Sequence, residues 1–181
     1  MTRMYFLAAL TSLTLCSFGV AYGAPKLKAD TPSTGAKAMF ENIDTLSDAI
    51  LQEVSSLHSV ALKGQRVEGD FDGLAIIKED VNKIGNEIGA LNAMRDSLVP
   101  WEVEALAQTA PLIREVAVNT DKAIQASNQM FMPSVSYIDN LVNISRNAER
   151  VKTVVHDYLK LESVREKELR IEHSLEEAAG S

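Results

Sequence analysis

Apolar residues recur at alternating spacings of three and four along four stretches of the chain, a pattern typical of helices packed in coiled-coil-like bundles. The first stretch covers about 33–62, and its apolar positions are Ala36, Met39, Ile43, Leu46, Ile50, Leu57 and Val60, with Glu53 interrupting the series. Gly64 follows it, where a left-handed C-cap residue is expected. The second stretch covers about 71–98, with apolar positions Leu74, Ile77, Val81, Ile84, Ile88, Leu91 and Leu98.

Prolines separate the later stretches. Pro100 breaks the second one and suits the first position of a new helix. The third stretch carries Val103, Leu106, Ala110, Ile113, Ala117, Thr120, Ile124, Ser127 and Phe131. Pro111 lies inside it, so we expect a kink there or a fresh start after Thr109. After a break at 132–134, the fourth stretch carries Tyr137, Leu141, Ile144, Ala148, Val151, Val155 and Tyr158.

Charged residues dominate after Lys160, where the apolar series thins to Leu161, Val164, Ile171 and Leu175. Glu162 with Arg165, and Glu166 with Arg170, have spacings that allow pairing on a helix surface. This composition predicts a solvated helical extension. A helix that binds a partner or dimerises is the alternative.

These patterns together predict an all-α protein. We expect an antiparallel up-down four-helix bundle over 35–160, because short connections make neighbouring helices antiparallel. A charged helical extension and tail follow at 161–181. An elongated three-helix arrangement, in which the third and fourth helices are partly continuous, is the main alternative.

The first residues differ from the rest of the chain. Arg3 is the only charged residue before Lys26, and an apolar run extends to Val20, followed by Ala21-Tyr22-Gly23. This order predicts a signal peptide at 1–23 with cleavage before Ala24, a flexible leader at 24–34, and a periplasmic or extracellular location. A retained membrane anchor is one alternative. Lipidation of Cys16 is another, because LTLC at 13–16 partly resembles a bacterial lipobox.

Charge and cysteine content narrow the classes of function. The net charge is −7 and no basic stripe is present, which argues against binding nucleic acid or anionic lipid. Cys16 is the only cysteine, so cleavage would leave a chain without disulfides or a thiolate nucleophile. We expect no stable membrane insertion after cleavage.

Motifs for catalysis or metal binding are absent from the sequence. The histidines His58, His156 and His173 have no His or Cys partner at a ligand spacing. We therefore predict a protein that is not an enzyme and has no metal site or cofactor. Gly85 and Gly89 lack the context of a dinucleotide-binding loop, and we expect them to allow close approach of a neighbouring helix.

One local resemblance concerns haem. The sequence ENIDTLSDAI at 41–50 resembles the first helix of small periplasmic four-helix b-type cytochromes, which hold haem between a methionine of that helix and a histidine of the fourth. The resemblance implies a haem-binding electron carrier with Met39 and His156 as ligands. Ile43 stands where the family's methionine would fall, and Met39 lies a turn earlier.

The preferred interpretation is a non-enzymatic binding or structural protein of the cell envelope, with the haem carrier as the alternative. Its contacts would run through an open groove of the bundle or through the charged C-terminal helix, by partner binding or self-association.

Overall fold

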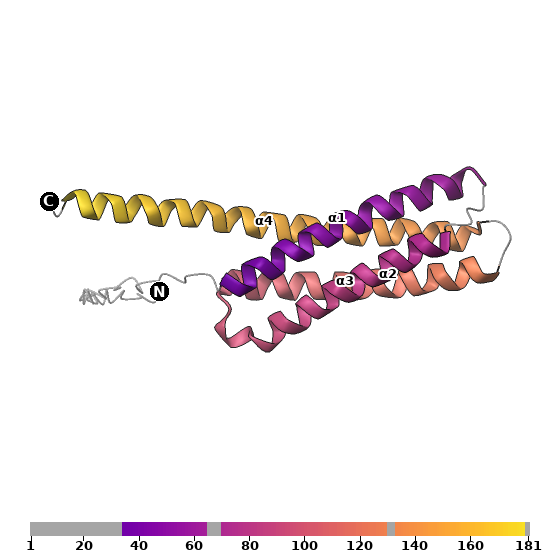
Figure 1. The fold of residues 1–181 in the computed structure, drawn as a ribbon, viewed down its shortest axis with the longest axis horizontal. Helices are drawn as coiled ribbons and strands as arrows, with labels where there is room; N and C mark the ends of the chain where they lie inside the picture. The colour runs from indigo at the N-terminus through magenta and orange to yellow at the C-terminus, as the bar shows by residue number, and fades with distance from the viewer. Residues whose placement is uncertain (1–33, 65–69, 130–132, 180–181) are drawn as a thin grey trace, which may run out of the picture. The chain divides into compact units, whose positions relative to one another are not determined.

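The computed structural model describes residues 34–64, 70–129 and 133–179, and every regular element in these ranges is helical. The elements are α1 (Thr34–Leu62), α2 (Asp70–Ala93), the short 3₁₀ helix η1 (Arg95–Ser97), α3 (Pro100–Gln129) and α4 (Val135–Ala179) (Figure 1). All of them belong to one compact unit. The prediction of an all-α helical bundle is confirmed. The predicted signal peptide, and the predicted leader up to residue 33, lie outside the described residues.

The four long helices contact one another in a closed order, α1 with α2, α2 with α3, α3 with α4, and α4 again with α1. Long-range polar contacts show the register between α1 and α4. Lys37 near the start of α1 contacts Glu166, whereas Asp48 farther along α1 pairs with Lys152. Partners on α4 therefore run in reverse order along α1, the order expected of antiparallel neighbours.

Local chemistry explains where several helices begin and end. Gly64, two residues past the end of α1, has a φ of 65°, as its predicted C-cap role requires. Pro100 occupies the first position of α3, and Glu102 Oε2 accepts a 3.0 Å hydrogen bond from the Val99 amide, which is one half of a capping box. At α4, Ser134 Oγ accepts a 3.1 Å hydrogen bond from the Tyr137 amide.

The buried face of α1 differs from the predicted one at alternate positions. Ala36, Ile43, Ile50 and Leu57 are buried as predicted, but the positions between them in the core are Phe40, Ser47, Val54 and Ala61. The prediction had placed Met39, Leu46, Glu53 and Val60 there, and these four side chains are only half-buried. Glu53 therefore does not interrupt the series of buried residues on α1, because the adjacent Val54 occupies that core position.

One further expectation about helix ends was wrong, and one of two alternatives at Pro111 is excluded. The second helix ends at Ala93, so Arg95–Ser97 can turn and Leu98 packs into the core from extended backbone. α3 continues through Pro111 without a fresh start. Pro111 and Ala107, whose carbonyl loses its amide partner, are both exposed, so water can hydrate that carbonyl. α3 and α4 are separate helices, because Pro133 and Ser134 are not helical.

Gly85 and Gly89 do not mark a close helix contact, contrary to expectation. A Cβ atom added at either position would meet no other atom within 4 Å. Both glycines lie on the exposed face of α2. Their only effect on stability is the backbone entropy that glycine loses in a helix.

We therefore expect Gly85→Ala and Gly89→Ala each to stabilise the protein by about 0.5–1 kcal/mol, because alanine restricts the unfolded chain and adds no clash. Urea unfolding followed by circular dichroism measures the effect. Gly73→Ala is the matched control on the same helix, since a Cβ there would lie 2.9 Å from Leu57 Cδ2. Loss of stability in the Gly85 or Gly89 variants would mean that another group contacts this face.

Candidate functional site

The two residues that the cytochrome resemblance named lie at different levels of the bundle. Met39 is half-buried and packs against the core, whereas His156 is exposed on α4. His156 interacts electrostatically with Asp44, which follows Met39 by more than one helical turn. The geometry therefore adds no support to a shared ligand pair.

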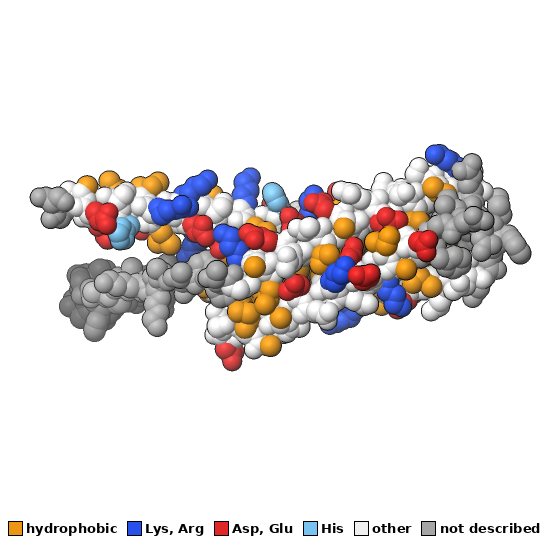
Figure 2. Space-filling model, in the orientation of Figure 1, with side chains coloured by type: hydrophobic (Ala, Val, Ile, Leu, Met, Phe, Trp, Pro, Cys, Tyr) orange, Lys and Arg blue, Asp and Glu red, His pale blue; other side chains and the backbone are white. Residues whose placement is uncertain are grey.

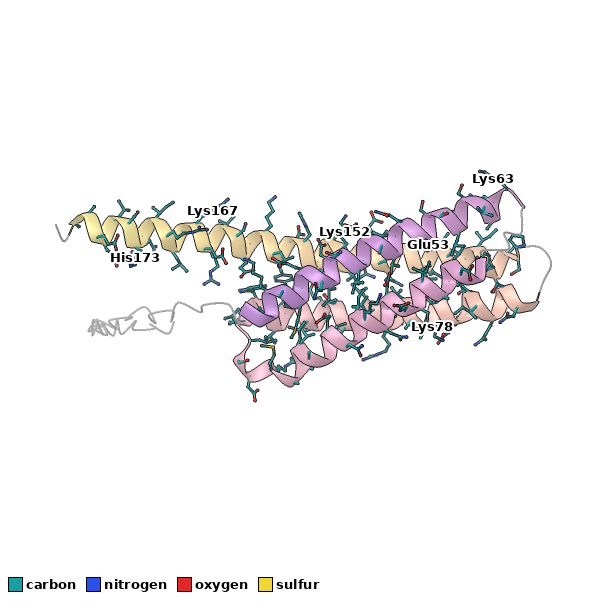
Figure 3. All side chains as sticks on the ribbon, viewed as in Figure 1. Glu53, Lys63, Lys78, Lys152, Lys167 and His173 are labelled. Carbon is teal, nitrogen blue, oxygen red and sulfur yellow. The ribbon has the colours of Figure 1, made fainter. Side chains whose placement is uncertain are left out.

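The other histidines are also dispersed. His58 is half-buried near the end of α1, and His173 is exposed on α4, 3.5 Å from Glu177 (Figure 3). Across residues 34–64, 70–129 and 133–179, no group of three or more His, Cys, Asp or Glu side chains is placed to hold a metal ion. Over the same ranges, no helix combines the length and the apolar character needed to cross a bilayer.

Shallow grooves lie between neighbouring helices. One groove of about 530 Å³ runs between α1 and α4, lined by Leu51, Ser55, Ser145, Glu149, Lys152, Thr153, His156 and Asp157. Burial raises the pKa of Asp44 on the α1 side of this region, and the charge of Asp48 adds to that rise. His156 and Lys152 oppose this rise. This surface is an ionic contact between two helices, with no nucleophile and base in hydrogen-bond contact.

The most unusual polar group lies where α4 leaves the bundle. Glu162 is 2% exposed, and neither of its carboxylate oxygens has a hydrogen-bond partner among the described residues. Its nearest cation is Lys37 of α1, whose Nζ is 3.8 Å from Glu162 Oε1. Lys37 is engaged more closely by Glu166, at 3.1 Å. We call Lys37, Glu162 and Glu166 the junction.

The electrostatics of the junction follow from burial and from an excess of acids. Burial raises the pKa of the Glu162 carboxyl, and the charge of Lys37 only partly opposes this. The carboxylates of Glu166, Glu102 and Glu41 raise it further. The hydrogen bond to Glu166 raises the pKa of Lys37. The junction therefore holds more negative charge than its single lysine balances.

Aromatic side chains pack beside the junction. The ring centroids of Phe40 and Trp101 are 6.3 Å apart, and those of Trp101 and Tyr158 are 6.2 Å apart in a stacked arrangement. Tyr158 Oη accepts a 3.3 Å hydrogen bond from Gln108 Nε2. These rings link α1, α3 and α4 at this end of the bundle.

Beyond the junction, α4 continues alone. It has 45 residues, whereas the other long helices have 24 to 30. We call residues 161–179 the α4 extension. Its first residues contact α1 at the junction. Every residue from Lys167 to Ala179 is exposed, and no other described helix runs beside 167–179 (Figure 1). Its exposed apolar side chains are interspersed with both charges (Figure 2), and they are Leu161, Val164, Leu169, Ile171 and Leu175.

The α4 extension is visible in the sequence, whereas the junction is not. Spacing within one helix revealed the thinning apolar pattern after Lys160. The contact between Lys37 and Glu162 joins residues far apart in the sequence, and no local signal announces it. The bundle contacts of α4 consequently extend to Glu166, past the boundary at residue 160 that composition had indicated.

Comparisons with models of known protein families, with curated protein sequences and with solved structures found no significant match to this chain.

Proposed function

We propose that this protein is exported and acts outside the cytoplasm as a non-enzymatic binding protein of the cell envelope, with the α4 extension as its contact surface. Export rests on the N-terminal sequence, with its single basic residue, apolar run and small residues before Ala24. The bundle supplies the rigid support, and its helices run in antiparallel up-down order. No cofactor or metal takes part.

The observation that carries the proposal is the exposure of the α4 extension. Ile171 and Leu175 are 59% and 64% exposed, in the part of α4 that no other described helix runs beside. Residues 167–179 are all exposed and add nothing to the bundle core, and an isolated helix of about that length is marginal in water, so this part of α4 gains stability by binding. Apolar side chains flanked by charges at helical spacing are the usual means by which a helix recognises a protein partner.

Truncation tests the proposal. A chain that ends at Lys167 keeps the junction and loses Leu169, Ile171 and Leu175. Because the removed residues are exposed, we expect its free energy of unfolding to stay within about 0.5 kcal/mol of the full chain. Proteins crosslinked to the full chain in the envelope fraction should be lost from the truncated chain, as read by affinity purification and mass spectrometry.

Two point variants sharpen the experiment. Ile171→Ser alters the α4 extension, and Ile76→Ser alters an apolar residue of α2 that is 47% exposed. Only the first should reduce the crosslinked set. The intact mass of the recovered protein should correspond to a chain that begins at Ala24. Equal recovery of partners with the truncated chain, or retention of the chain in the cytoplasm, would contradict the proposal.

A further inference from the structure

We propose that the α4 extension pairs with the α4 extension of a second copy of this chain, in antiparallel orientation. The inference rests on the proposed function, because it assigns an occupant to the same surface. Three features of the extension support it, namely its apolar face, its distribution of charge and the register that these two allow.

The apolar face has the spacing of a two-helix seam. Leu161, Val164, Ile171, Leu175 and Ala178 recur at intervals of three, seven, four and three residues, and Glu168 occupies the intervening position. Leu161 and Val164 are 49% and 45% exposed although they adjoin the bundle. Glu162, between them, points into the bundle instead. The seam therefore lies on the side of α4 away from α1, where a second helix can dock without displacing it.

Charge is unevenly distributed along the extension and favours an antiparallel partner. The segment 160–170 holds four basic residues against three acidic ones, and two of those acids, Glu162 and Glu166, already contact Lys37. The segment 171–179 holds three glutamates, and it has no lysine or arginine. Antiparallel pairing places each acidic segment beside the basic segment of the other copy, whereas parallel pairing places the two acidic segments together.

The seam positions define one antiparallel register. Val164 then faces the second copy's Leu175, Leu161 faces its Ala178, and Glu168 faces its Ile171. A parallel pair would instead bring the two copies of Glu168 into contact at the centre of the seam. Like charges in contact there are destabilising, so the parallel arrangement is disfavoured.

Flanking residues agree with this register. In the antiparallel pair Arg165 lies beside the second copy's Glu172, and the symmetry of the dimer makes this contact twice. In a parallel pair Lys160 would instead lie beside the second copy's Arg165. The extension ends at Ala179, level with the point where the second copy's seam begins at Leu161, so the overlap uses its whole length.

Cysteine crosslinking distinguishes the two orientations. In the full chain carrying Cys16→Ser, Val164→Cys and Leu175→Cys are made as separate variants. We expect a disulfide-linked dimer when the two variants are mixed and oxidised, and little from either alone, because each cysteine faces the other position across the pair. Crosslinking of the Val164→Cys variant with itself would overturn the antiparallel register.

Sedimentation equilibrium tests the association itself, at concentrations up to about 100 μM. We expect a dimer, and an Ile171→Asp variant should dissociate at least about tenfold more readily, because it places a charge in the seam. Ile76→Asp, on α2, should leave the equilibrium unchanged. Arg165→Glu and Glu172→Arg should each weaken the dimer, and the two changes together should restore it.

The outcomes separate this inference from the proposed function. If the full chain stays monomeric at these concentrations, the inference that a second copy binds the α4 extension is wrong. If truncation at Lys167 still removes crosslinked envelope proteins from that monomer, the proposed function stands with a different protein as partner. A dimer that resists Ile171→Asp would also overturn the inference, because the contact would then lie elsewhere.

Discussion

Replacing Phe40 by alanine should destabilise the protein by about 3–5 kcal/mol, the usual cost of removing a buried aromatic side chain and leaving a cavity. Phe40 is 1% exposed and packs against Trp101, which in turn stacks on Tyr158. The change removes a contact that α1 makes with α3. Urea unfolding, monitored by tryptophan fluorescence and circular dichroism, gives the change in free energy.

Met39→Ala is the matched control, because the same type of truncation one residue earlier removes a half-buried side chain. We expect a cost of about 1 kcal/mol, since much of that side chain already contacts water. A larger loss from Met39→Ala than from Phe40→Ala would mean that the buried face of α1 follows the originally predicted series. Comparing the two variants therefore shows which residues of α1 face the core.

Replacing Lys37 by methionine should cost about 1–3 kcal/mol at neutral pH, because it leaves the buried Glu162 carboxylate without its cation. Glu162 is 2% exposed, and neither of its oxygens accepts a hydrogen bond from a described residue. Lys37 itself is partly exposed and tolerates replacement by an apolar side chain of similar length. Urea unfolding at several pH values gives the cost.

The dependence on pH follows from the raised pKa of Glu162. The folded protein binds the proton more tightly than the unfolded chain, whose carboxyl has its ordinary value of 4.5. Stability conferred by Glu162 is therefore greatest below that pH and falls as the pH rises from it through the raised folded pKa. In the Lys37→Met variant the loss of stability with rising pH should be larger. The variant should therefore approach the stability of the wild type only at acidic pH.

Glu162→Met is the control for this mechanism. It removes the buried charge, so we expect stability at neutral pH to be unchanged or higher, and the pH dependence in that window to shrink. In the Glu162→Met background, Lys37→Met should cost less than about 0.5 kcal/mol. A full cost in that background would show that Lys37 stabilises the protein through Glu166 instead.

Periodicity alone located the helices but could not fix which side of α1 faces the core. A spacing of three and four fits either phase between Ala36 and Ile43, because Met39 and Phe40 are both apolar. At Glu53 and Val54 hydrophobicity already favours the apolar residue, and Val54 is buried. Between Met39 and Phe40 only contact with neighbouring helices decides, and Phe40 is the buried one.

The α4 extension and the junction differ in the same respect, because the sequence reveals the first and not the second. The apolar and charged residues of the α4 extension are neighbours along one helix, so their spacing is visible in the sequence. The junction between Lys37 and Glu162 depends on the register of α1 against α4, which side-chain packing sets. At Gly85 and Gly89 the sequence was misleading instead. The two glycines predicted close packing of a neighbouring helix, but a Cβ atom added at either position would have no neighbour within 4 Å.

Local sequence patterns were enough to predict the all-α class, the four helical stretches, and the roles of Pro100 and Gly64 at helix ends, because these depend on interactions within a few residues along the chain. The tertiary structure alone decided the buried face of α1, the burial of Glu162 and the length of α4 that stands clear of the bundle. Each of these depends on which surfaces of different helices meet, and that choice minimises the exposed apolar area of the whole chain rather than of any one segment.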